Sequence, residues 1–315
     1  MTGSSAARPT IEERELKFNR NIARAGAAIV LTAAAGTASA QVLNDIEELD
    51  WDRPEAWAMK FFSSVSLLTG LGPPRAREPW SFEIGLELDT IPHLDEDQRR
   101  VGFGGAKVED LNRLPVFARP RLTIGLPAKL SLDVAWVPPV ELRGVKSNLF
   151  SLALERPVFS TGPWTLGVRV YGQLGTVEGD LTCSEEDASS PPGSPGNIWG
   201  CEAPSKDELT LNYLGAAFTG GYRYRKTDFH WGLAANYMDM EFQVDARTFG
   251  FHDRSLLLAD GWTWSFNTGA SWRLGGRTSV AVELFYSPLS VVRPPSTSSE
   301  NDPLINLRTM LRFDL

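Results

Sequence analysis

Few side chains of this 315-residue sequence combine in a pattern that is typical of catalysis. Its three histidines are His93, His230 and His252. His230 lies two positions after Asp228, and His252 lies three positions before Ser255. These two histidines are therefore the ones that could act as a general base, with Asp228 as an orienting acid or with Ser255 as a nucleophile. Neither pair belongs to a Ser–His–acid set that the sequence pattern brings together. We therefore predict no catalytic residues, no metal site, no cofactor and no enzymatic activity.

The first forty residues resemble a cleaved secretory signal peptide. Arg20 and Arg24 end a basic region, and residues 25–38 form a small apolar stretch that is too short to span a bilayer. Ala38-Ser39-Ala40 then supplies the small-x-small cleavage pattern, which would make Gln41 the mature N-terminus. We therefore expect an exported protein. Its net charge of -8 argues against nucleic acid as a partner.

The two cysteines of the chain, Cys183 and Cys201, lie in one stretch that is rich in Pro, Ser, Gly and acidic residues. Apolar segments flank this stretch on both sides. Because exported proteins fold in an oxidising compartment, the pattern predicts a disulfide that closes the loop.

Beyond residue 41 the dominant signal is an apolar residue at every second position, separated by short turns. The alternating segments run nine to twelve residues or more, which is the length that a tilted strand needs to cross a bilayer. We therefore predict an all-β fold, a transmembrane antiparallel β-barrel of ten strands. The predicted strands are 80–90, 116–126, 129–138, 144–157, 163–177, 208–225, 228–249, 261–275, 277–288 and 304–315.

The connections between these strands alternate in length. Bacterial barrels have short periplasmic turns and long external loops, so the start of the first strand and the end of the last strand should both lie in the periplasm. The long connections are 90–115, 178–206, 250–260 and 288–303, and the short ones lie near 127–129, 156–163, 226–228 and 275–276.

Segment 54–69 does not fit the strand count. Pro54 and Glu55 form a helix start, and Trp57, Phe61 and Val65 fall on one helical stripe. We predict a short helix on the periplasmic side or plugging the barrel. The alternative is a strand with a second one unrecognised, which would give twelve. The predicted organisation is a signal peptide (1–40), an N-terminal periplasmic or plug segment (41–79) and the barrel (80–315).

The alternation places charged residues of neighbouring strands on the inward face. In a closed barrel, the acids of the first strand would lie between the arginines of the second strand and those of the last. We expect a salt-bridged lumen that sets the register; the alternative is a charged constriction that selects solutes. The predicted lumen charges are Glu83, Glu87, Asp89, Arg119, Arg121, Arg169, Arg273, Glu283, Arg308 and Arg312.

Aromatic residues gather near the ends of the predicted strands, as in the two aromatic girdles of a membrane barrel. The residues predicted to form these girdles are Trp80, Trp136, Trp164, Trp231, Trp262, Trp264, Trp272, Tyr286 and Phe313.

The signal peptide, the alternating strands and the final strand Ile305–Leu315 resemble Gram-negative outer-membrane β-barrel proteins of the porin and fatty-acid-transporter kind. The resemblance covers about residues 80–315 and is architectural. It implies insertion by the barrel-assembly machinery and contact with outer-membrane lipid and lipopolysaccharide. The ending Phe313-Asp314-Leu315 departs from the commoner terminal aromatic.

Our functional expectation is a passive channel or transporter for small solutes, hydrophobic ones included. The alternatives are a structural or adhesive barrel that presents external loops, and a membrane-embedded hydrolase.

Overall fold

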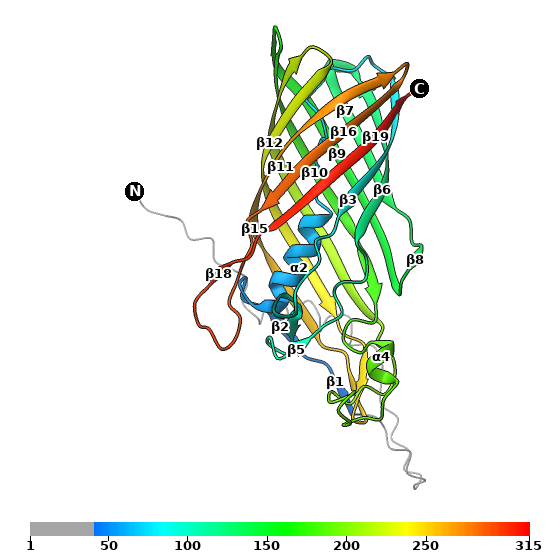
Figure 1. Cartoon of the computed structure of the whole chain (residues 1–315), viewed down its shortest axis with the longest axis vertical. Helices are drawn as coiled ribbons and strands as arrows, with labels where there is room; N and C mark the ends of the chain where they lie inside the picture. Colours follow the sequence, from blue (N-terminus) through cyan, green and yellow to red (C-terminus); the bar gives the residue numbers. More distant parts are fainter. Residues whose placement is uncertain (1–40) are drawn as a thin grey trace, which may run out of the picture. The chain divides into compact units, whose positions relative to one another are not determined.

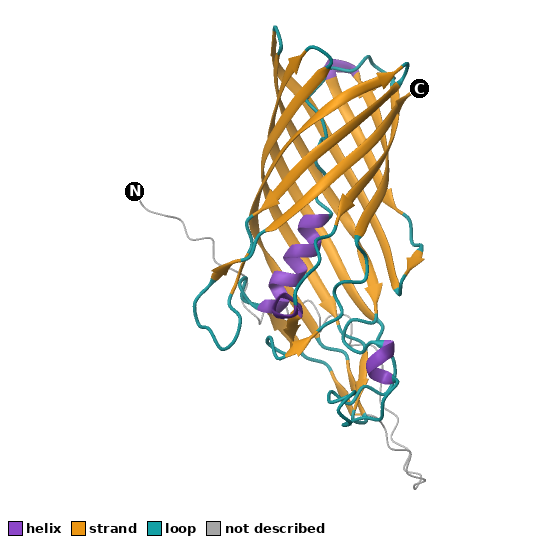
Figure 2. Cartoon of the chain, viewed as in Figure 1, coloured by secondary structure: helices purple, strands orange, loops and turns teal. Residues whose placement is uncertain are grey.

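The computed structural model describes residues 41–315, and the predicted signal peptide lies outside them. Within this range ten antiparallel strands form a closed barrel, because the last strand pairs with the first (Figures 1 and 2). The prediction of ten strands is thus confirmed over the alternative of twelve. The barrel strands are β3 (Phe82–Thr90), β6 (Val116–Leu126), β7 (Leu130–Val137), β9 (Val145–Thr161), β10 (Trp164–Gly179), β11 (Asp207–Tyr224), β12 (Thr227–Gln243), β15 (Leu256–Gly275), β16 (Thr278–Ser287) and β19 (Leu304–Asp314).

The outer face of the barrel is an apolar surface. In β19, Leu307 and Leu311 are about half exposed, whereas Arg308 between them is fully buried in the lumen. A closed barrel satisfies all backbone hydrogen bonds between strands, so it can carry such a surface through lipid. Of the predicted girdle aromatics only Trp231 is half-buried and the others are exposed. The ring of Trp231 lies over Gly220, whose missing side chain leaves room for it.

The two ends of the barrel differ, and we name them the short-turn end and the long-loop end (Figure 1, top and bottom). The rule for bacterial barrels predicts that the short-turn end faces the periplasm. Both the start of β3 and the end of β19 lie there. The long loops carry the elements β4 (Arg100–Gly102), β5 (Lys107–Val108), β8 (Glu141–Leu142), β13 (Ala246–Thr248), β14 (Phe251–Asp253), β17 (Ser290–Val291), β18 (Glu300–Asn301), α3 (Glu96–Arg99) and α4 (Glu185–Ala188).

Three strand boundaries differ from the prediction by more than two residues. The predicted long connection 250–260 lies earlier, because β12 ends at Gln243 and β15 already begins at Leu256. The turn predicted at 156–163 is tighter, because β9 continues to Thr161 and meets β10 at Trp164.

The N-terminal segment runs through the barrel. Its first strands, β1 (Gln41–Leu43) and β2 (Ile46–Glu48), pair in parallel with β14 and with the start of β15 at the long-loop end. The helix α2 (Pro54–Val65) then enters the lumen, and the chain continues to the short-turn end. There the Trp80 amide donates to the carbonyl of Gly125, at 2.7 Å. We call residues 54–79 the plug.

The helix α2 starts as predicted, with Pro54 in its first turn and Glu55 beside it. It is buried on nearly all sides, Lys60 and two serines included, because barrel strands and loops surround it. It ends at Val65 rather than continuing to residue 69, and the amide of Leu68 donates to the hydroxyl of Tyr213 on the barrel wall, at 3.0 Å. Within the described part of the chain, no helix is long and apolar enough to cross a membrane.

Candidate functional site

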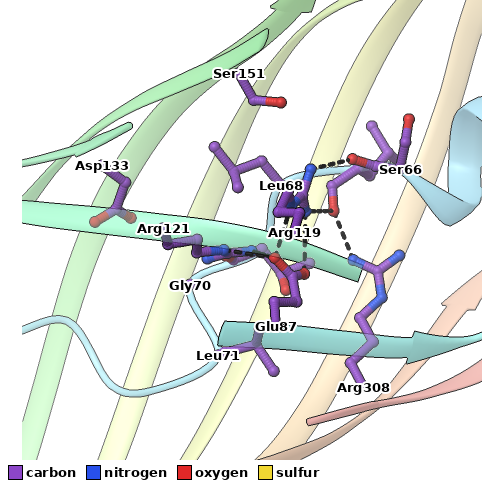
Figure 3. Close-up of polar contacts among 12 residues, drawn as sticks. Ser66, Leu68, Gly70, Leu71, Glu87, Arg119, Arg121, Asp133, Ser151 and Arg308 are labelled. Carbon is purple, nitrogen blue, oxygen red and sulfur yellow. Dashed lines mark hydrogen bonds and ion pairs between the residues drawn. The ribbon is translucent and has the colours of Figure 1, made fainter. Parts of the chain in front are cut away.

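Four inward-facing arginines hold the backbone of the plug, and we call them the arginine clamp. Figure 3 shows three of them, Arg119, Arg121 and Arg308. Arg119 and Arg121 project from β6, and Arg308 and Arg312 from β19. All four donate to backbone carbonyl groups between residues 64 and 71. The N–O distances are 2.8 Å from Arg119 to Ser66, 2.7 Å from Arg121 to Thr69, 2.6 Å from Arg308 to Leu67, 2.9 Å from Arg308 to Ser64, 3.0 Å from Arg312 to Gly70 and 2.6 Å from Arg312 to Leu71.

Glu87 of β3 balances two members of the clamp. Its carboxylate accepts from Arg119 at 2.7 and 3.0 Å and from Arg121 at 2.5 Å, and it is fully buried. Charge-assisted hydrogen bonds of this kind are the strong ones in protein interiors. The register places Glu87 directly opposite Arg119 on β6, in the order that alternation and closure predict.

On the β19 side the arrangement differs from the expected row of ion pairs. Arg312 lies 3.4 Å from Glu83, which also accepts from Arg77 of the plug at 2.8 Å. Arg308 forms no ion pair with any described residue: its donors go to plug carbonyls and Asn306, and it stacks over the ring of Phe285 at 3.7 Å. The reason is that the plug supplies backbone carbonyl groups as acceptors for Arg308, and the alternation of residues along the strands gives no information about them.

The other predicted lumen charges are distributed around the wall. Arg169 lies 2.7 Å from Asp133, a partner that strand parity could have identified. Glu283 accepts from Asn267 and from Thr69 of the plug and lies 3.2 Å from His230. Asp89 is fully buried and its carboxylate makes no hydrogen bond with a described residue. Arg273 is exposed at the short-turn end and lies outside this buried set.

A cavity of about 410 Å³ lies between α2 and the long loops, and we call it the outer cavity. Its wall is mainly apolar, and its size is within the range of small-molecule pockets. Met59 and Phe62 line it from α2. The other apolar residues that line it are Ala58, Val101, Phe103, Leu111, Leu181, Leu209, Phe242, Val244 and Leu257.

Charged groups are confined to a few positions around the outer cavity. Arg53 lies 2.8 Å from Glu47 and 3.2 Å from Glu55. Glu109 lies 2.7 Å from Lys107 and is buried. Burial raises the pKa of Glu109 to about 7, although the attraction of Lys107 opposes this shift. This cavity therefore has a carboxyl group whose charge changes near neutral pH.

The predicted disulfide between Cys183 and Cys201 is present and lies beside the outer cavity. Both cysteines are buried against Val244 and Ala246. Thr182 lines the cavity, and its amide donates to Asp207 at 2.6 Å. The disulfide therefore fixes a loop that forms part of the cavity wall.

A smaller cavity of about 90 Å³ adjoins the outer cavity and lies behind an interruption of the barrel wall. The pairing of β6 with β7 stops at Arg121 and Ala135. Residues 116–120 pair with β3 on one side but with no described strand on the other. Pro120 lacks the amide for such a pairing, and two prolines follow the end of β7. We call this interruption the wall split.

Both cavities share part of their lining. Phe62 of α2 faces both, as do Leu111, Leu181 and Leu209. Phe117 and Leu149 line the smaller cavity from the two sides of the wall split. A continuous apolar lining thus leads from the long loops to the interrupted wall.

Comparison with known proteins identifies the architecture only. No family model matches the chain, and no curated protein does. The structure is similar to the outer-membrane protease OmpT of Escherichia coli, with 11% identity, 75% of this chain and 94% of that chain covered, and a TM-score of 0.35. It is also similar to an outer-membrane channel of Pseudomonas putida F1, with 10% identity, 79% and 100% coverage, and a TM-score of 0.36.

The toluene transporter TodX of Pseudomonas putida is similar at 12% identity, with 86% of this chain and 78% of that chain covered, and a TM-score of 0.33. All of these proteins are outer-membrane barrels, but their functions differ. The expected resemblance to outer-membrane β-barrel proteins is confirmed at the level of the fold, whereas the outer-membrane location stays a prediction. The signal peptide and the assembly machinery as a partner stay predictions.

The histidines do not form a nucleophilic site within residues 41–315. The ring of His252 lies 2.6 Å from Asp245, whereas the hydroxyl of Ser255 donates to Asp253 at 2.6 Å. His93 lies 3.5 Å from Asn112. In the described chain no group of three or more His, Cys, Asp or Glu side chains could hold a metal ion.

Proposed function

We propose that this protein takes up a small, neutral, apolar solute from outside the cell through the outer cavity. The observation that carries the proposal is the apolar pocket of about 410 Å³ between α2 and the long loops. Pockets with apolar walls and a few polar groups are typical of small-molecule sites.

The charges around the outer cavity favour a neutral solute over an anion. Glu47, Glu55, Glu109 and Asp253 line it together with a single cation, Arg53. An anion entering the cavity would meet these carboxylates at short range, and desolvating its charge would add a further cost. A neutral aromatic or aliphatic molecule incurs neither cost.

The plug argues for capture of a solute rather than free diffusion through the lumen. Backbone carbonyls of the plug are fixed by four buried arginines, and these side chains occupy the lumen beside it. A ten-strand barrel has little interior space beyond what side chains fill. The wall split supplies another route, because the apolar lining continues from the outer cavity to it. The solute would then leave sideways into lipid.

The test is saturable photolabelling of the full chain, purified in a neutral detergent, with a small neutral aryl diazirine. We expect labels on the α2 peptide that contains Met59 and Phe62, and competition by unlabelled naphthalene. Ala58→Phe fills the cavity from α2 and should abolish the saturable labelling. The matched control is Ala216→Phe, because Ala216 is exposed on β11 outside the cavity.

A transport measurement completes the test. Cells that produce the protein should accumulate radiolabelled naphthalene faster than cells without it, and Ala58→Phe should remove this difference. If both variants take up label at the wild-type rate, or if the α2 peptide is labelled only in proportion to probe concentration, the proposal is wrong.

A further inference from the structure

A third cavity, whose lining is basic rather than apolar, lies at the short-turn end. Its volume is about 570 Å³, and Pro73 and Pro74 of the plug form part of its lining. Lys129, Arg223 and Arg273 line it from the barrel strands and turns, and Arg75 from the plug. We call it the basic vestibule.

The cations of the basic vestibule exceed its anions. Four basic side chains face a single carboxylate, Asp228, which gives a net charge of +3. Asp228 accepts from Arg75 and, at 2.7 Å, from Arg223. Two further cations, Lys129 and Arg273, are exposed there. The vestibule therefore has positive charge that its own residues do not neutralise.

Arg75 has more hydrogen-bond donors than the described residues have acceptors for them. Its Nε is buried and has no hydrogen-bond partner in the described chain. Burial lowers the pKa of Arg75, and the nearby cations Arg223, Arg77 and Arg273 add to this effect, whereas Asp228 opposes it. A buried donor without an acceptor is rare in folded proteins, so the ion pair with Asp228 is the one described contact that balances the charge of Arg75.

We propose that the basic vestibule binds a small anion with two or more negative charges, carried by phosphate or carboxylate groups. The guanidinium group presents paired N–H donors whose geometry matches both kinds of oxyanion. Arg75 and Arg223 lie beside Asp228, and Arg273 and Lys129 line the same cavity, so an anion with two charges can pair with more than one of these cations. This function goes beyond uptake of an apolar solute, because the two cavities lie at opposite ends of the plug.

The position of the cations favours a soluble anion over a lipid headgroup. Arg223 and Arg273 have the inward parity of their strands, since Tyr222 and Tyr224 flank Arg223 and Trp272 and Leu274 flank Arg273 on the outward face. A lipid whose chains lie outside the barrel would have to bend its headgroup over the rim to reach them. A soluble ligand enters directly from the periplasm.

The experiment is isothermal titration of the full chain, in a neutral detergent, with inorganic pyrophosphate and separately with citrate. We expect saturable binding of at least one of them, weakened by added sodium chloride because the contacts are ionic. A preference for pyrophosphate would identify phosphate chemistry, and a preference for citrate would identify carboxylate chemistry.

Arg273→Gln is the informative variant, because Arg273 lines the vestibule and is exposed, so its loss should leave the fold intact. It should weaken binding about tenfold, the effect of losing one charge-assisted contact. The control is Arg277→Gln, which removes an equal charge from the neighbouring turn outside the vestibule. The proposal is wrong if neither anion binds saturably, or if both variants weaken binding equally. Neither result bears on labelling of the outer cavity.

Discussion

The two ends of the plug face cavities of opposite character. At the long-loop end Met59 and Phe62 line an apolar cavity whose charged residues are mainly carboxylates. At the short-turn end Pro73 and Arg75 line a polar cavity whose charged residues are mainly cations. The arginine clamp lies between them and fixes the carbonyl groups of residues 64–71. One continuous segment, the plug, therefore separates two cavities whose linings differ in polarity and in the sign of their charge.

The clamp and the outer cavity also differ in what holds them together. The clamp depends on buried charges that a carboxylate or plug carbonyl groups must compensate, because an uncompensated buried charge is strongly destabilising. The outer cavity depends on loops, a disulfide and apolar side chains. Damage to the clamp should therefore affect the stability of the whole barrel, whereas damage to the outer cavity should affect local order and ligand binding.

The largest effect is expected from Glu87→Gln. This change leaves Arg119 and Arg121 without their carboxylate partner in a fully buried site. We expect the free energy of unfolding to fall by roughly 3–5 kcal/mol, the range for breaking a buried pair. The measurement is urea unfolding in detergent, followed by the gel shift of the heat-modifiable barrel. Glu78→Gln, at an exposed position, is the control. Equal midpoints for the two variants would mean that the clamp does not stabilise the barrel.

The double variant Cys183→Ser/Cys201→Ser should have a smaller and local effect. The disulfide joins positions 18 residues apart, and closing a loop of that length stabilises a fold by about 3 kcal/mol. Hydrogen exchange should speed up in the 180–206 loop, and diazirine labelling in the outer cavity should weaken. The midpoint of barrel unfolding should stay the same. A lower barrel midpoint would show that the loop and the barrel unfold together, which would remove the distinction between the two regions.

Arg308→Met tests the hold of the clamp on the plug. It removes the donor to the carbonyl group of Val65 and the shortest hydrogen bond to the carbonyl groups of Ser64 and Leu67. We expect a local loss of about 2 kcal/mol, the cost of leaving a buried acceptor unpaired. Hydrogen exchange should rise in residues 64–71 but not in β12. Arg308→Lys keeps one donor group, so its hydrogen exchange in residues 64–71 should lie between that of the wild type and that of Arg308→Met. Unchanged exchange in the plug would show that other contacts suffice to hold it.

Local sequence patterns predicted the barrel because strand alternation and closure depend on short-range rules. The ion pairs of Glu87 with Arg119 and Arg121 follow from parity alone. The wall split also had a signal in Pro120 and the Pro138-Pro139 pair, although it was not recognised.

The route of the plug could not be predicted in this way. It depends on parallel pairing between residues 41–48 and 251–258, which lie some two hundred positions apart in the chain. No local pattern encodes that contact. The partners of Arg308 were missed for the same reason, because they are backbone carbonyls of a segment whose position in the lumen was unknown. The outer cavity and the basic vestibule form where the plug meets the barrel wall, so they could not be predicted from the sequence either.

The smallest effect is expected from the pH dependence of the outer cavity. Burial raises the pKa of Glu109 to about 7, so its carboxyl group is mainly neutral at pH 6 and mainly charged at pH 8. A neutral lining favours an apolar ligand, so saturable diazirine labelling should strengthen as the pH falls through 7. The change should be a few-fold at most, because Glu109 is a single residue in a lining that is mainly apolar. Glu109→Gln, which is neutral at every pH, should make the labelling independent of pH between these values. If Glu109→Gln keeps the wild-type pH dependence, another group is responsible, and the charge of Glu109 does not affect ligand binding in the outer cavity. Labelling of the basic vestibule region should not change in either protein, because Glu109 does not line it.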